Sequence, residues 1–236
     1  MFQTNPFLLI ILFVGLSLLP FVAMIATSYL KIVVVMSLIR NALGIQSIPP
    51  NMVLNALAMI LTFYIIAPVA SESWGLLQQE MAARRQGTAV ASSAPAAAPD
   101  AASGGDWLET DAVARAAEPF RAWLSAHTSD RERAFFVHTA ETLWAKDGEP
   151  ATVDPESYYI LLPSFCVSEL TKAFQIGFLV YLPFIAIDII VSNILLAMGM
   201  MMVSPVTISL PFKLLLFVMV NGWTLLIQGL VRGYIL

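Results

Sequence analysis

Hydrophobic and polar positions divide the chain into three regions: an apolar block at residues 1–70, a polar insert at 71–157 and a second apolar block at 158–236. In the first block, the stretches 6–27 and 51–70 each hold about the 20 apolar residues that a helix needs to cross a bilayer. The pattern therefore predicts two membrane-spanning helices before the insert. No small-residue cleavage pattern follows the first stretch, so we expect it to be retained rather than removed as a signal peptide.

A shorter apolar stretch, 29–43, lies between these two segments and is too short to cross a bilayer comfortably. We expect a helix that ends at Gly44, because glycine readily adopts the left-handed conformation that closes a helix. Arg40 would then lie in the last turn, where the helix dipole favours a cation. Two prolines follow, and Pro50 or Asn51 is predicted to begin the next helix.

The polar insert combines a low-complexity segment with two short amphipathic patterns. Residues 86–105 are rich in Ala, Ser, Pro and Gly and have almost no large apolar side chain, which predicts a flexible excursion. Helical spacing of apolar residues follows at 107–126, where Pro119 is expected to bend or break the helix, and again at 134–145. A capping box at 129–132 precedes the second pattern. The insert is therefore predicted to contain a small helical domain that needs neighbours to be stable.

The second apolar block opens with helix-start signals and continues for longer than one simple span. Asp154 offers an N-cap and Pro155 a favourable first helical residue. The stretch 158–198 that follows is punctuated by Pro163 and Pro183. A further apolar segment, at 212–230, is predicted after an interruption.

The interruption, at 198–211, contains four methionines in five positions, a glycine and two prolines. Methionine is unbranched and polarizable, so it fills irregular gaps that other side chains leave. Two interpretations of the cluster are open: ordinary core filling at a turn between membrane helices, or a deformable seal. The residues concerned are Met200, Met201 and Met202.

Composition supports a membrane-associated protein, since 58% of the residues are hydrophobic and only 12% are charged, against about 25% charged in soluble domains. The insert is acidic, with seven basic and fourteen acidic residues between positions 71 and 157. No basic surface suggests nucleic acid as a partner. If 51–70 spans the membrane, Lys31 and Arg40 place the short loop before it on the cytoplasmic side and the insert on the far side.

Metal and disulfide chemistry have little support in the sequence. The one cysteine, Cys166, forms neither an internal disulfide nor a cysteine-based metal cluster. Both histidines, His127 and His138, lie in the insert, which argues against a histidine-ligated metal or haem in the apolar blocks. We expect no metal ion and no cofactor.

Four ionisable residues in the second apolar block could carry chemistry or assembly. Glu169 and Lys172 are three residues apart, a spacing that favours an ion pair on a helix surface. Asp188 lies between isoleucines and Lys213 follows a proline. An ionisable group in hydrocarbon costs at least about 2.5 kcal/mol, so each should face protein, water or a partner charge. Asp188 is then either a functional group or one member of an ion pair that fixes subunit register.

Polar side chains elsewhere in this block favour assembly over catalysis. Amide groups in apolar segments provide buried hydrogen bonds between helices, and here they are Gln175, Asn193, Asn221 and Gln228. Serine–lysine spacings of four residues occur at 168 and 172 and at 209 and 213, but no oxyanion-hole motif or third orienting residue accompanies them. An intramembrane enzyme or ion-coupled transporter that uses Asp188, Glu169 and Lys172 remains the alternative of another class.

Six stretches of the chain resemble the signature motifs of the SctR/FliP family, core export-apparatus proteins of bacterial type III secretion in injectisomes and flagella. The resemblance covers nearly the whole chain except the Ala-rich excursion. The stretches are Ile39-Arg40-Asn41-Ala42-Leu43-Gly44-Ile45-Gln46, Pro49-Pro50-Asn51-Met52-Val53-Leu54-Asn55, Ser168-Glu169-Leu170-Thr171-Lys172-Ala173-Phe174-Gln175-Ile176-Gly177-Phe178, Tyr181-Leu182-Pro183-Phe184, Met198-Gly199-Met200-Met201-Met202 and Ser209-Leu210-Pro211-Phe212-Lys213.

Details of these motifs favour the injectisome branch over the flagellar orthologue, which is the alternative within the family. The residues Gly44-Ile45-Gln46 and 51–55 are more similar to those of injectisome members. The lack of a long cleavable leader is also more typical of that branch. Asn221 departs from the pattern, because many relatives have Asp-Gly-Trp where this chain has Asn-Gly-Trp.

The resemblance implies an all-α, membrane-associated protein that catalyses no reaction. Several copies would join the related subunits SctS and SctT in a pseudo-hexameric helical cone, the entrance of the channel for unfolded secreted proteins. SctU, SctV and the needle and inner-rod base would be further partners, in the bacterial inner membrane with the insert on the periplasmic side. An ATPase and the proton motive force would supply the energy.

The resemblance also assigns residues and decides between the two interpretations of the methionines. Met200, Met201 and Met202 would project into the lumen as a gasket. Contacts within or between subunits would involve Glu169, Lys172, Asp188, Lys213 and Arg40.

Overall fold

The computed structural model describes residues 6–45, 48–91, 110–145, 151–200 and 202–235, and within these ranges the chain forms helices and connecting turns without a β-strand. This architecture confirms the predicted all-α class. Residues 92–105 of the predicted flexible excursion, the first residues of the pattern at 107–126, and Met201 lie outside the described ranges.

The first apolar block forms α1 (Pro6–Ile25), α2 (Tyr29–Ala42) and the start of α3 (Asn51–Ala91). The predicted end of α2 is confirmed, since Gly44 has φ of +77° and Arg40 lies in the last turn of α2. The predicted start of the next helix is confirmed too, since α3 begins at Asn51. The prediction that the helix from Asn51 ends at residue 70 is wrong, because α3 continues for 41 residues into the insert. Residues 71–91 are mostly good helix formers such as Ala, Gln, Glu and Leu, so the loss of hydrophobicity there does not end the helix.

The insert continues with α4 (Thr110–His127) and α5 (Asp130–Leu143). Pro119 lies inside α4 and does not break it, because α4 packs along α3 and α6, which hold it in place. Ser129 is the N-cap of α5, but α5 begins earlier than the predicted residue 134. The backbone N–H of Ser129 donates to the Ser168 hydroxyl at 2.9 Å instead of to Glu132, so the predicted capping box is replaced by a contact with α6.

The second apolar block forms α6 (Tyr158–Ala197), α7 (Pro205–Met219) and α8 (Gly222–Arg232). Three details differ from the sequence-based expectation. The N-cap of α6 is Ser157, since Asp154 instead closes a turn by accepting the N–H of Glu156 at 2.9 Å. A single 40-residue α6 includes both of its prolines. The predicted segment 212–230 is broken at Asn221, which has a left-handed φ of 50°.

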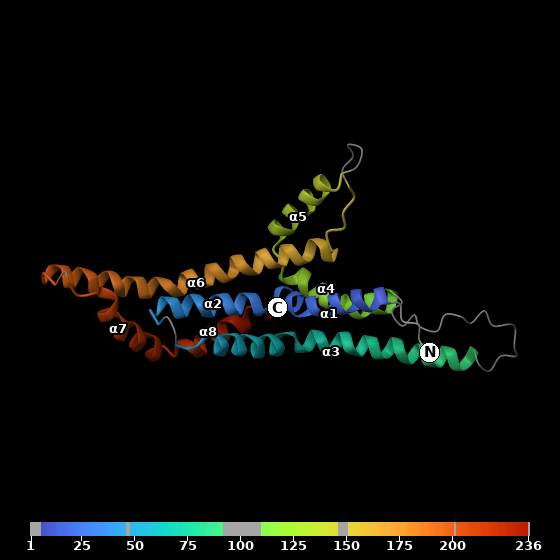
Figure 1. The fold of residues 1–236 in the computed structure, drawn as a ribbon, viewed down its shortest axis with the longest axis horizontal. Coiled ribbons are helices and arrows are strands. Elements are labelled where there is room, and N and C mark those ends of the chain that lie inside the picture. The colour runs from blue at the N-terminus through green and yellow to red at the C-terminus, as the bar shows by residue number, and fades with distance from the viewer. Residues whose placement is uncertain (1–5, 46–47, 92–109, 146–150, 201, 236) are drawn as a thin grey trace.

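Helix α2 is the centre of the fold, lying between α6 and α3 (Figure 1). Its buried side chains recur at helical spacing, at Ile32, Val35, Met36 and Ile39. Helix α6 is in contact with α2, α4, α5 and α7, whereas α5 projects away from the body. The α2–α6 contact is close, because a Cβ atom at Gly177 would lie 2.3 Å from Leu38 Cδ1. The resulting bundle is long and thin.

Two helices are long and apolar enough to cross a membrane, within 51–82 and 158–197. The count rises to four if each of two bent pairs is one span: 13–25 with 29–42, and 205–219 with 222–232. Their outer faces carry many exposed large apolar side chains. Such surfaces must be covered by lipid or by other protein, which agrees with the predicted membrane association.

Candidate functional site

The methionine turn joins α6 to α7 at one end of the molecule (Figure 1). Gly199 has φ of +75° and its N–H donates to the Leu196 carbonyl at 3.0 Å, while the Met200 N–H donates to the Leu195 carbonyl at 2.9 Å. This pair of bonds is a Schellman motif, which satisfies the last carbonyls of a helix when glycine takes the left-handed position. The glycine in the methionine run therefore ends α6 sharply and fixes the position of the turn that carries the methionines.

The described methionines of this turn are not part of the core of the chain. Met198 and Met202 are strongly exposed, and Met200 is 41% exposed. Core filling within this chain therefore does not account for them. Their side chains are free to contact another subunit, lipid or the contents of a channel.

An ion pair holds α6 and α7 together behind the methionine turn. Lys213 Nζ lies 2.6 Å from Asp188 Oδ2 and donates to the Ala42 carbonyl at 3.2 Å. The Ser209 hydroxyl donates to Asp188 Oδ1 at 2.6 Å. The cluster thus joins α6, α7 and the end of α2. Ser209 donates to a carboxylate that is also paired with Lys213, so its hydroxyl is part of the contact between α6 and α7.

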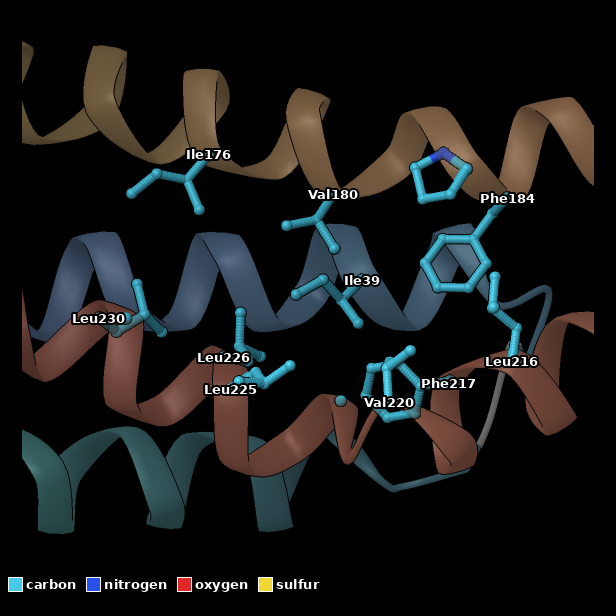
Figure 2. Close-up of a pocket in the computed structure, with 13 residues that line it drawn as sticks. Ile39, Ile176, Val180, Phe184, Leu216, Phe217, Val220, Leu225, Leu226 and Leu230 are labelled. Carbon is cyan, nitrogen blue, oxygen red and sulfur yellow. The ribbon is translucent and has the colours of Figure 1, made fainter.

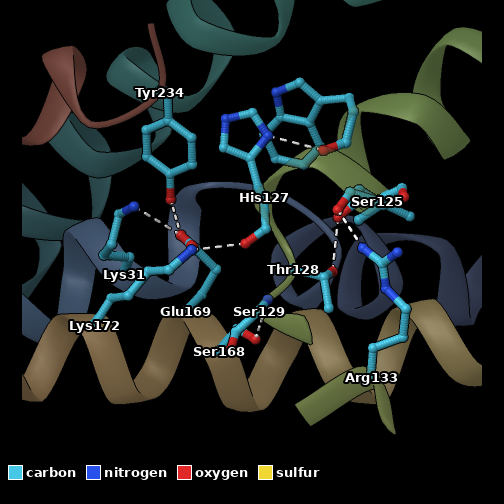
Figure 3. Close-up of polar contacts among 12 residues, drawn as sticks. Lys31, Ser125, His127, Thr128, Ser129, Arg133, Ser168, Glu169, Lys172 and Tyr234 are labelled. Atoms are coloured by element: carbon cyan, nitrogen blue, oxygen red, sulfur yellow. Dashed lines mark hydrogen bonds and ion pairs between the residues drawn. The ribbon is translucent and has the colours of Figure 1, made fainter. Parts of the chain in front are cut away.

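A second ionic cluster surrounds Glu169 on α6, whose side chain is 0% exposed (Figure 3). Lys31 Nζ of α2 lies 2.9 Å from Glu169 Oε2, and Lys172 Nζ lies 3.2 Å from Oε1. The Tyr234 hydroxyl donates to Oε2. The predicted pair of Glu169 and Lys172 is present, but the expectation of a surface pair is wrong. A carboxylate without water contact depends on these partners for its stability.

The same cluster connects the membrane helices to the insert (Figure 3). Lys172 Nζ donates to the His127 carbonyl at 2.7 Å, where α4 ends. The Tyr234 ring is stacked on Trp123, with centroids 6.0 Å apart, and lies 3.6 Å from Lys31 Nζ. Burial, followed by the Glu169 carboxylate, raises the pKa of the Tyr234 phenol, so the hydroxyl keeps its proton and donates.

Three members of this cluster, Lys31, His127 and Tyr234, were not predicted as site residues. Lys31 gave a usable signal, because a cation inside an apolar stretch needs a partner charge. The Lys31 side chain is buried against Glu169, which supplies that partner charge. No comparable signal pointed to His127 or Tyr234.

Other predicted polar residues lie apart from these clusters. Arg40 Nη1 donates to Asn51 Oδ1 and so joins the end of α2 to the start of α3. The four amide residues expected to be buried are exposed on this chain: Gln175, Asn193, Asn221 and Gln228. Their hydrogen-bonding groups are available to an assembly rather than used within the chain.

An apolar cavity of about 480 Å³ lies between α2, α6, α7 and α8 (Figure 2). Ile39, Val180, Phe184 and Leu226 are among the side chains that line it. Such a groove suits an apolar occupant and offers no group for catalysis. Among the described residues, no three or more His, Cys, Asp or Glu side chains gather where they could hold a metal ion.

The chain is similar over nearly its whole length to known proteins. The pattern of the FliP family matches residues 12–230. The Yop proteins translocation protein R of Yersinia pestis is 47% identical over 226 residues, 96% of this chain and 95% of the relative. The hypersensitivity response secretion protein HrcR of Ralstonia nicotianae is 44% identical over 226 residues, 96% of both chains.

A flagellar relative is less similar. The flagellar biosynthetic protein FliP of Agrobacterium fabrum is 37% identical over 225 residues, 93% of this chain and 80% of the relative. The predicted preference for the injectisome branch is confirmed by this difference. The names of these relatives describe translocation, secretion and flagellar biosynthesis, in agreement with the prediction that the chain catalyses no reaction. The chain belongs to the FliP family of type III secretion export proteins, in its injectisome branch.

Proposed function

We propose that this chain is a gate subunit of the type III export apparatus, and that Met200, Met201 and Met202 form its seal. Several copies, together with the related subunits SctS and SctT, surround the entrance through which unfolded secreted proteins pass. The exposure of the described methionines at a sharply fixed turn is the observation that carries this proposal.

The chemistry of methionine suits such a seal. A ring of apolar side chains closes a narrow conduit by excluding water, since a small apolar constriction does not stay wet. Thioether side chains have three rotatable bonds and repack around different shapes, so the constriction can yield to a passing polypeptide and close again. The seal thus needs no chemical step in this subunit.

The ion pair behind the turn supports the same role. Asp188 and Lys213 fix α7 against α6 at 2.6 Å, and Lys213 also reaches the end of α2. A loop that must close a conduit repeatedly requires anchored flanking helices, and this cluster joins α6 and α7 about three helical turns before the loop. Glu169 and Lys172 join α6 to α2 and to the end of α4, and Arg40 joins the end of α2 to the start of α3.

We further propose that the chain lies in the bacterial inner membrane with the insert, residues 71–157, on the periplasmic side. SctU and SctV would receive substrates on the cytoplasmic side, and the needle and inner-rod base would lie beyond the insert. The two to four candidate spans support insertion in a membrane, and Lys31 and Arg40 before the second apolar stretch support a cytoplasmic loop there and an insert on the far side.

Replacement of Met200, Met201 and Met202 together by alanine tests the seal. We expect the assembly with its related subunits to keep its mass, because the exposed Met200 and Met202 side chains do not support the fold, while its ion conductance in a planar bilayer rises at least tenfold. The control replaces two other exposed methionines, Met52 and Met219, by alanine. An unchanged conductance in the triple variant, or an equal rise in the control, would contradict the proposal.

A further inference from the structure

Two cavities meet where α7 ends and α8 begins. The apolar cavity of about 480 Å³ extends from this joint along α8, and Ile176 and Leu230 line its far end (Figure 2). A second cavity, of about 420 Å³, has the Arg40 side chain in its lining. Phe217 and Gly222 line both cavities, so the two adjoin at the joint between α7 and α8.

The apolar cavity has the form of a groove between α6 and α8. Ile176 of α6 and Leu226 of α8 lie on opposite sides of it (Figure 2). The groove follows α8 from Gly222 to Leu230, a distance of about 12 Å along the helix. Gly229 keeps it open, because a Cβ atom added there would meet no other atom within 4 Å. A narrow apolar groove of this length suits an extended hydrocarbon chain.

Arg40 is a cation that no carboxylate balances among the described residues. Lys31, Lys172 and Lys213 each have a carboxylate oxygen within 3.2 Å of Nζ. Arg40 instead donates from Nη1 to the neutral amide oxygen of Asn51, and its Nε has no hydrogen-bond partner. A guanidinium carries five N–H donors, so this one can still bind an anion beside the groove.

We infer that the two cavities together bind one anionic phospholipid, with its phosphate at Arg40 and one acyl chain in the groove. The groove alone would accept any apolar partner, whereas an unbalanced cation at its end favours an anion that carries a hydrocarbon chain. Arginine binds phosphate through parallel N–H bonds. Basic pockets between membrane helices on the cytoplasmic side are typical binding places for the head groups of anionic lipids.

The direction of the groove agrees with such a lipid. In the proposed arrangement Arg40 lies on the cytoplasmic side, and α8 runs from there toward the insert, where Tyr234 is stacked on Trp123. A lipid of the inner leaflet has the same direction, with its head group at the surface and its chains toward the bilayer centre. Trp223 lines the cavity of Arg40, and tryptophan is enriched at the level of lipid head groups. This orientation rests on the proposed function, whereas the binding itself does not.

Native mass spectrometry of the purified full chain, and of its assembly with the related subunits, tests the site. Phosphatidylglycerol, which is anionic, and phosphatidylethanolamine, which is zwitterionic, are added in turn. We expect one phosphatidylglycerol per chain, bound about fivefold more tightly than phosphatidylethanolamine, which is the effect of one arginine near an anionic head group. Arg40→Gln keeps a donor for Asn51 but has no charge, so it should abolish this preference. Arg40→Lys should retain most of it.

A second variant tests the groove. Gly229→Leu should weaken the binding of both lipids by a similar factor, because the new side chain fills the groove without a clash at its Cβ. Gly75→Leu is the matched control, since a Cβ there also meets no atom within 4 Å and α3 does not line the groove. The control should bind both lipids as the unmodified chain does.

Four outcomes would overturn the lipid site and leave the proposed gate standing. They are equal binding of the two lipids, a preference that survives in Arg40→Gln, unchanged lipid binding in Gly229→Leu, and displacement of the lipid by inorganic phosphate, which would indicate a phosphate site without an acyl chain. A lipid bound to the single chain but absent from the assembly would show that a neighbouring subunit fills the groove, and would overturn the inference too. Failure of the chain to assemble with the related subunits would instead overturn the proposed function, while lipid binding is still measured on the single chain.

Discussion

At the scale of single residues, the molecule depends on charges that are removed from water. The Glu169 carboxylate is wholly buried and has Lys31, Lys172 and Tyr234 as partners. Desolvation of two buried charges roughly cancels their attraction, so such a pair adds little stability over an apolar pair. Loss of one partner is costly, because the remaining charge has neither water nor a counter-ion.

Glu169→Gln should therefore destabilise the subunit by about 3–5 kcal/mol, because Lys31 loses its counter-ion in a buried position. Denaturation of the purified protein in detergent micelles measures this change. Lys31→Met added to Glu169→Gln should restore most of the loss, since the unpaired buried cation is then gone. Glu118→Gln, which removes an exposed pair with Arg121 on α4, is the control and should change little. A Glu169→Gln variant as stable as that control would refute the account of this cluster.

The sequence predicted which residues need partners better than it predicted the partners. A charge in an apolar segment must be paired, and on that basis Glu169, Lys172, Asp188 and Lys213 were selected. Lys172 was expected beside Glu169 because the two share a helix, but Lys31 is 138 positions away and comes from α2. Contacts over such separations depend on how the helices pack. The local sequence pattern holds no information about that packing.

At the scale of elements, α2, α6 and α7 end at residues in the left-handed conformation rather than at prolines. Pro119, Pro163 and Pro183 all lie inside helices, while the ends of α2 and α6 are marked by glycines with positive φ. The sequence therefore predicted the end of α2 correctly and overestimated the proline breaks. The break at Asn221 does not follow from the hydrophobic pattern, because an amide in an apolar segment fits a buried contact between helices equally well.

The close approach of α2 and α6 at Gly177 gives a prediction for an element pair. Gly177→Leu should destabilise the subunit by about 1–3 kcal/mol through overpacking, because Leu38 occupies the space that a side chain would need. Leu38→Ala should restore part of the loss in the double variant. The control is Gly75→Leu on α3, where no atom lies within 4 Å of the added Cβ. Equal effects at the two glycines, measured by denaturation in detergent, would show that the α2–α6 approach is not tight.

At the scale of the whole molecule, the isolated chain is an incomplete structure. Many large apolar residues on α1, α3, α6 and α7 are exposed, and the amides at Gln175 and Asn193 lie among them. Hydropathy predicted apolar helices correctly, but it does not tell whether lipid or a neighbouring subunit covers them, since both are equally apolar. The family assignment and the exposed polar positions favour neighbouring subunits for the outer face of α6.

The most direct test of the gate is an electron cryomicroscopy map of the assembly purified with its related subunits. The account predicts that Met200 and Met202 from every copy point to a common axis, with thioether groups of adjacent copies within about 4 Å of each other. A map in which these side chains point outward into lipid or detergent, with no conduit shared among the copies, would contradict it.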